Sequence, residues 1–161
     1  MLYIGIDTGT HTGIAVWDAA TRKFLDIDCV LLHQALLKVK SMWEMRKDIR
    51  VRFEDARKRK WFDTRTARQD RARLQGAGSV KRDCNIWEEF LTDYKIPYDA
   101  VPPCHNATKL SAEAFRRITK WEKRTNEHSR DAAMLVYGKT VLNCLFDVVL
   151  TNNKTKQKRK K

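Results

Sequence analysis

Four side chains of metal-binding type stand where regular structure is expected to hold them: Asp7, Glu54, His128 and Asp131. Asp7 follows an apolar run at 2–6 and precedes a Gly-containing turn, whereas Glu54 ends a run that alternates apolar and charged residues. Hydrolysis of a phosphodiester by two metals needs several hard ligands around two Mg²⁺ or Mn²⁺ ions, about 3.5–4 Å apart. The four residues therefore predict a nuclease site, provided that the fold brings them together.

Each of these residues also has an ordinary explanation. Asp7 can simply cap its turn, and Glu54 can pair with Arg57 on the surface. His128 can be an exposed polar residue near a helix start, and Asp131 can favour the positive helix N-terminus. Because His128 and Asp131 are three apart on an expected helix, they share one face. Taken together with the basic composition, the joint hypothesis is favoured over four separate explanations.

The hydrophobic pattern predicts the elements that would position these side chains. We expect strands at 2–6, 13–18, about 24–30, 49–54 and 96–101, and helices at 31–47, 106–119 and 126–145. The small-residue segment 76–80 precedes further helical spacing up to Tyr94. Its glycines either break a helix or let it lie close to the sheet or to a second subunit.

The charge of the chain favours an anionic partner. Its 161 residues contain 33 Lys and Arg against 20 Asp and Glu, a net charge of +13, and nucleic acid is the commonest such partner. The most basic internal stretch has two aromatic side chains that can stack on bases, which favours DNA contact over a merely solvated surface. This stretch consists of Arg57, Lys58, Arg59, Lys60, Trp61 and Phe62. We expect one domain over 1–150 and a disordered basic tail over 151–161.

The cysteines indicate a reducing compartment. None of Cys29, Cys84, Cys104 and Cys144 forms a Cys-x-x-Cys pair, and the adjacent Cys104-His105 is only a weak zinc signal. We expect reduced thiols that mostly pack in the interior of a cytoplasmic protein. No apolar run is long enough to cross a membrane.

The ordered motifs resemble the RuvC-type Holliday-junction resolvases of the ribonuclease H-like superfamily. The resemblance rests on the segment 4–9 (Ile-Gly-Ile-Asp-Thr-Gly), on Phe53-Glu54 at the end of the fourth strand, and on 128–133 (His-Ser-Arg-Asp-Ala-Ala). It covers the order of elements from residue 1 to about 145. It implies an α/β fold with a five-stranded mixed sheet flanked by helices. It also implies an endonuclease that uses two Mg²⁺ or Mn²⁺ ions, acts on four-way DNA junctions and forms a homodimer.

The resemblance assigns roles to individual residues. The acidic ligands of the family correspond to Asp7, Glu54 and Asp131, and the fourth ligand, which is Asp in many members and His in some, corresponds to His128. An aromatic near the junction centre corresponds loosely to Trp61 or Phe62. Lys109 resembles a basic residue that contacts phosphate, so we expect it to bind DNA together with residues 57–62. The small size and the lysine-rich end are similar to phage-encoded members.

Three other functions are compatible with parts of this pattern. Actin-like and Hsp70-like ATPases use a similar Asp-x-Gly-Thr turn, but they need two lobes, for which this chain is too short. A non-catalytic DNA-binding protein would not need Glu54 and Asp131 at matching places. A nuclease that cuts RNA–DNA hybrids or flaps, or a transposase-type nuclease, would have the same metal centre, because fold and metal site do not determine the substrate.

Overall fold

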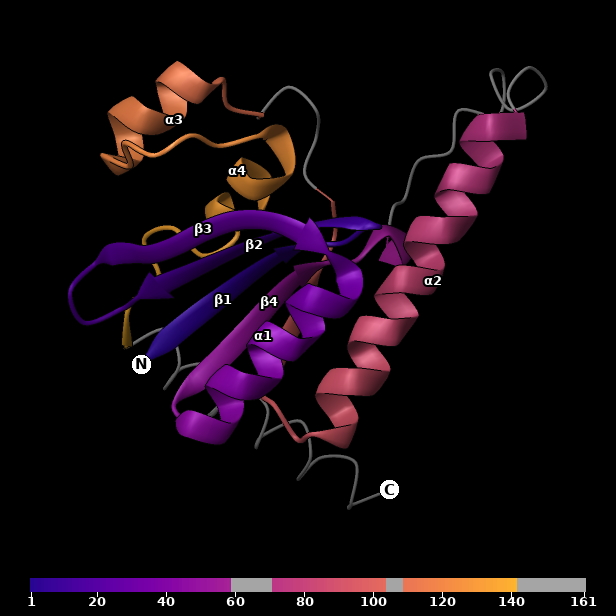
Figure 1. Ribbon diagram of the computed structural model, residues 1–161, viewed down its shortest axis with the longest axis horizontal. Coiled ribbons are helices and arrows are strands. Elements are labelled where there is room, and N and C mark those ends of the chain that lie inside the picture. Colours follow the sequence, from indigo (N-terminus) through magenta and orange to yellow (C-terminus); the bar gives the residue numbers. More distant parts are fainter. Residues whose placement is uncertain (59–70, 104–108, 142–161) are drawn as a thin grey trace, which may run out of the picture.

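The computed structural model describes residues 1–58, 71–103 and 109–141 (Figure 1). Five strands form one sheet in the order β3-β2-β1-β4-β5. Strand β1 is antiparallel to β2 and parallel to β4, and β4 is parallel to β5, which confirms the predicted five-stranded mixed sheet. The strands are β1 Leu2–Asp7, β2 His11–Asp18, β3 Lys23–Leu31, β4 Ile49–Glu54 and β5 Tyr98–Val101.

Helices α1 (Leu32–Met45) and α2 (Arg71–Asp93) cover one face of the sheet (Figure 1). Alternate residues of the strands, Ile4 and Ile6 among them, face these helices and form the main core. The helices contribute fully buried side chains to the same core, such as Val39 and Trp87. The predicted amphipathic character of both helices is thereby explained by burial against the sheet.

The glycine-rich segment does not break α2. The helix runs continuously through Gly76 and Gly78, and a Cβ at Gly78 would meet nothing within 4 Å. Each glycine lowers helix stability by about 1 kcal/mol relative to alanine, but the second half of α2 is fixed by the buried residues Cys84, Trp87 and Leu91. This burial outweighs the local cost. The first half of α2 extends beyond the end of the sheet (Figure 1).

Helices α3 (Ala112–Thr119) and α4 (Glu127–Met134) lie on the opposite face (Figure 1). Ser111 caps α3, so this helix begins later than the predicted start at 106. Helix α4 begins as predicted, with Asn126 as its cap, but it ends at Met134 rather than continuing to 145. The chain turns after it, and Gly138 has φ +75°, a conformation that glycine adopts at little cost. Val136 is buried with Tyr3 and Trp17, so its apolar character reflects packing after the helix.

Two strand glycines let α4 approach the sheet. A Cβ at Gly5 would lie 2.0 Å from the backbone oxygen of Ala132, and one at Gly13 would lie 2.1 Å from the backbone oxygen of His128. No other residue fits at these positions without moving the helix. The close approach places the first turn of α4 beside the end of β1. None of the helices in the described ranges is long and apolar enough to cross a membrane.

Candidate active site

The two strand acids occupy equivalent positions on neighbouring strands. Ile6 of β1 is in register with Phe53 of β4, so Asp7 and Glu54 each follow one member of this pair. Both acids stand at the end of their strand, as predicted. The buried hydroxyl of Thr8 donates a hydrogen bond of 2.9 Å to the backbone oxygen of Glu54, which ties the two strand ends together.

Helix α4 supplies the other two predicted residues. Nδ1 of His128 lies 2.8 Å from Oδ2 of Asp7 and hydrogen bonds to it. When Nδ1 carries the proton, Nε2 of the neutral imidazole keeps a lone pair that can accept a proton or bind a metal. Asp131 lies one turn further along α4, close enough for its charge to act on Asp7. The structure thus brings both strand ends and the first turn of α4 to one place.

Lys109 completes this cluster with a cation. Its ammonium lies 2.9 Å from Oδ2 of Asp131 and also forms an ion pair with Glu127. These two carboxylates raise the pKa of Lys109 above its ordinary value and keep it charged. Lys109 therefore connects the segment before α3 to the first turn of α4.

Burial perturbs the carboxyl group of Asp7. Only 14% of this side chain is exposed, and the loss of hydration raises its pKa above the ordinary value. The bond and charge of His128 act in the opposite direction, the negative charge of Asp131 raises the pKa further, and Lys109 lowers it. The ionised form of a carboxyl group in such a buried position is stabilised electrostatically when a cation approaches it.

The kinds of donor at this site, carboxylates and an imidazole, are ones that bind divalent cations. Within the described residues, however, no three such groups are close enough to hold one ion. Asp7 is bonded to His128, and Asp131 is bonded to the Lys109 ammonium. Metal binding at Oδ2 of Asp131 would therefore compete with the Lys109 ammonium.

The fold was compared with known proteins. No protein-family model and no curated protein matches the sequence. Among solved structures, T. thermophilus RuvC in complex with Holliday junction substrate matches with a TM-score of 0.54 and 16% identity, over 84% of this chain and 89% of that one. The chain has the fold of RuvC. The expected ribonuclease H-like architecture is thereby confirmed.

The predicted DNA contacts lie partly outside the described part of this RuvC fold. Arg59, Lys60, Trp61 and Phe62 belong to the undescribed segment 59–70, and the tail 151–161 also lies outside the described residues. Arg57 forms ion pairs with the buried Asp55 and with Glu88 of α2, and Lys58 donates a hydrogen bond to a backbone oxygen of β5. Both side chains are therefore engaged within the protein, so their role in DNA binding stays a prediction.

The sequence reasoning missed the residues that hold this site together within the RuvC fold. Gly5 and Gly13 admit α4, and Thr8 joins the ends of β1 and β4. A glycine inside an otherwise apolar strand was the available signal for such a close backbone approach. The pairing of Asp7 with His128 had no local signal, because 121 positions separate the two residues.

Proposed function

We propose that this protein is a metal-dependent endonuclease that cuts branched DNA, with four-way junctions as its substrate. The hydrogen bond between Asp7 and His128, with Asp131 one turn further along α4, carries the proposal. It is supported by the net charge of +13 and by the fold shared with RuvC, a protein solved with a Holliday junction.

The four predicted residues would hold two Mg²⁺ or Mn²⁺ ions: Asp7, Glu54, His128 and Asp131. When bound, such ions activate a water molecule and stabilise the leaving oxygen. The protein's own contribution is to fix the ligands on rigid elements, because Asp7 and Glu54 end paired strands and α4 is seated on two glycines. His128 Nε2 would bind an ion or hold a proton near the scissile phosphate.

Lys109 changes partner in this proposal. In the structure its ammonium neutralises Asp131. If Asp131 held an ion instead, the Lys109 ammonium would be free beside the site to pair with a phosphate oxygen of DNA. This exchange explains how a cluster now held by a lysine serves as a metal site.

The remaining DNA contacts and the assembly follow from the basic surface and from the family resemblance. The segment 57–62 would contact the junction through its cations and through stacking of Trp61 or Phe62. A homodimer would present two such sites, one for each of two symmetric strands. The protein would act in DNA recombination or repair, in a cytoplasmic setting.

A panel of substrates tests the proposal. Purified protein is incubated with four-way junctions, flaps, linear duplexes and RNA–DNA hybrids, with Mg²⁺, with Mn²⁺ or with EDTA. We expect cutting of junctions that needs a divalent ion, and loss of cutting but not of binding in Asp7→Asn. Binding without cutting under any metal condition would identify a binding protein instead. Stronger cutting of hybrids or flaps would contradict the choice of substrate.

A further inference from the structure

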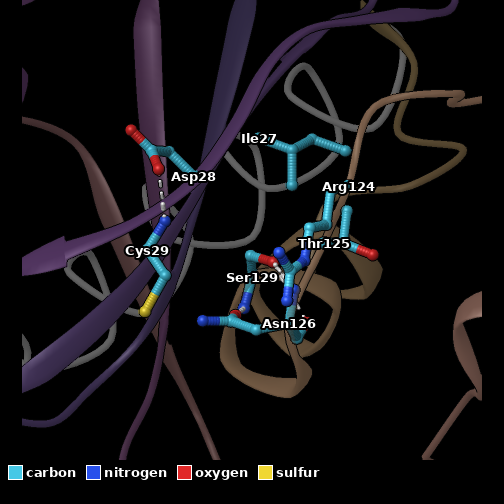
Figure 2. Close-up of a pocket in the computed structure, with 7 residues that line it drawn as sticks. All are labelled: Ile27, Asp28, Cys29, Arg124, Thr125, Asn126 and Ser129. Carbon is cyan, nitrogen blue, oxygen red and sulfur yellow. Dashed lines mark hydrogen bonds between the residues drawn. The ribbon is translucent and has the colours of Figure 1, made fainter.

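A cavity of about 360 Å³ lies between β3 and the segment that leads into α4 (Figure 2). One wall is the edge strand β3, with Ile27, Asp28 and Cys29. The other wall is the segment that leads into α4, with Arg124, Thr125, Asn126 and Ser129. The volume is in the range of sites for small molecules.

The register of the sheet relates this cavity to the active site. Asp7 of β1 is paired with Gly13 of β2, and Gly13 is paired with Cys29 of β3. Paired residues point to the same face of a sheet, and strands are about 4.8 Å apart, so Cys29 lies about 10 Å from Asp7 on the face that carries α4. On the helix side, Ser129 follows His128 directly. Because the backbone of His128 lies directly over Gly13, the cavity and Asp7 flank the first turn of α4, one on each side.

The lining offers hydrogen-bonding groups that have no partner in the part of the chain that the structure describes. Among the described residues, no hydrogen bond or ion pair is formed by the guanidinium of Arg124, the hydroxyl of Thr125, the side-chain nitrogen of Asn126 or the thiol of Cys29. Asn126 is fixed in place because its amide oxygen accepts from the backbone N–H of Ser129. Figure 2 shows these groups around the opening, with Ile27 beside them. The lining thus combines the small exposed part of Ile27, which is 7% exposed, with a fixed amide and a guanidinium that pairs with no other described residue.

We infer that this cavity binds a single unpaired nucleotide of the DNA strand, next to the bond that is cut. Ile27 would contact the face of the base, Asn126 and Thr125 would meet its polar edge, and Arg124 would pair with a phosphate. A base in a duplex cannot enter such a recess without leaving the stack, and this costs least where pairing is already interrupted. The cavity would thus select branch points and set a base preference at one position. This inference rests on the proposed function.

The thiol of Cys29 provides a test that does not depend on cleavage. The full-length protein is treated with N-ethylmaleimide in EDTA, and modification of Cys29 is followed by peptide mass spectrometry. We expect a four-way junction to slow this modification at least tenfold, and an abasic nucleotide at one position near the crossover to restore it. The inference is overturned if the junction binds without protecting Cys29, or if no abasic position restores reactivity. Equal protection by inorganic phosphate alone would indicate an anion site and would also overturn it.

A second measurement follows the choice of cleavage position. Cys29→Phe fills the cavity and Arg124→Ala removes its cation, so both should reduce the base preference at the affected position at least fivefold. Leu25→Phe on the exposed part of β3 and Arg117→Ala on α3 are matched controls outside the cavity, and they should keep the preference. Cleavage with an unchanged preference in both cavity variants contradicts the inference alone. Absence of cleavage in the unmodified protein contradicts the proposed function. The protection of Cys29 would still show whether the cavity binds a nucleotide.

Discussion

His128 and Asp7 form a direct 2.8 Å hydrogen bond between the first turn of α4 and the end of β1. This contact joins two segments that are 121 positions apart in the sequence. The hydrogen bond forms only because α4 packs closely against Gly5 and Gly13. The geometry of the site therefore depends on how α4 packs on the sheet.

Replacing Asp7 with Asn should stabilise the protein at neutral pH. Burial raises the pKa of Asp7 in the folded state above its ordinary value of 3.8, so the folded state binds this proton more tightly than the unfolded state does. At a pH above the folded-state pKa of Asp7, its ionised carboxylate therefore lowers the free energy of unfolding. This loss of stability disappears as the pH falls towards the ordinary pKa of the carboxyl group. We expect Asp7→Asn to raise the melting temperature at pH 7, by about 2–4 °C per kcal/mol relieved, with a smaller difference near pH 4. Equal or lower stability of the variant at pH 7 would contradict this account.

Removing the Lys109 ammonium should tighten the binding of divalent ions. In the structure this group pairs with Asp131, so an incoming ion has to displace it. We expect Lys109→Met to lower the Mn²⁺ dissociation constant severalfold in titration calorimetry without DNA. Lys23→Met, an exposed lysine at the start of β3, controls for the loss of one positive charge and should have little effect. Weaker binding in Lys109→Met would show that the lysine supports the metal site.

A methyl group at Gly13 should displace α4. Its Cβ would lie 2.1 Å from the backbone oxygen of His128, and backbone cannot move away as a flexible side chain can. We expect Gly13→Ala to lower the free energy of unfolding by more than about 2 kcal/mol and to abolish activity. Gly78→Ala in α2 is the matched control, since it meets nothing within 4 Å and should stabilise its helix by up to about 1 kcal/mol. Urea denaturation of both variants provides the comparison, and similar stabilities would refute the steric argument.

Arg57 should contribute to stability through Asp55. The carboxyl group of Asp55 is buried, which by itself raises its pKa, but the side-chain and backbone hydrogen bonds of Arg57 hold the pKa below its ordinary value. This stabilisation is present above the ordinary carboxylate pKa and is lost as the pH falls through the folded value. At pH 7 we expect the free energy of unfolding of Arg57→Gln to be about 3 kcal/mol lower than that of Lys58→Gln. The difference between the two variants should become smaller at acidic pH. A pH-independent gap would exclude the ion pair as its cause.

Truncation of the chain before Lys154 should weaken binding to every kind of DNA alike. The removed segment carries six cations. For duplex DNA, each phosphate contact that is lost reduces the slope of log binding constant against log salt concentration by about 0.9. Binding isotherms for junctions and linear duplexes between low and moderate salt measure this slope. Weaker binding to junctions alone would mean that the tail recognises branched structure.

The sequence by itself determined the kinds and positions of the elements, because alternation and helical spacing are local consequences of burying one face of a strand or a helix. It therefore placed Asp7 and Glu54 at strand ends and His128 at the start of a helix. It left open whether the glycines break α2, where buried neighbours decide the outcome. It placed the end of α4 too late, because a left-handed turn follows that helix. Only the tertiary structure decided that His128 meets Asp7, that Lys109 occupies Asp131, and that a cavity opens beside them. Those contacts depend on the close packing of α4 across two strands, which no local pattern encodes.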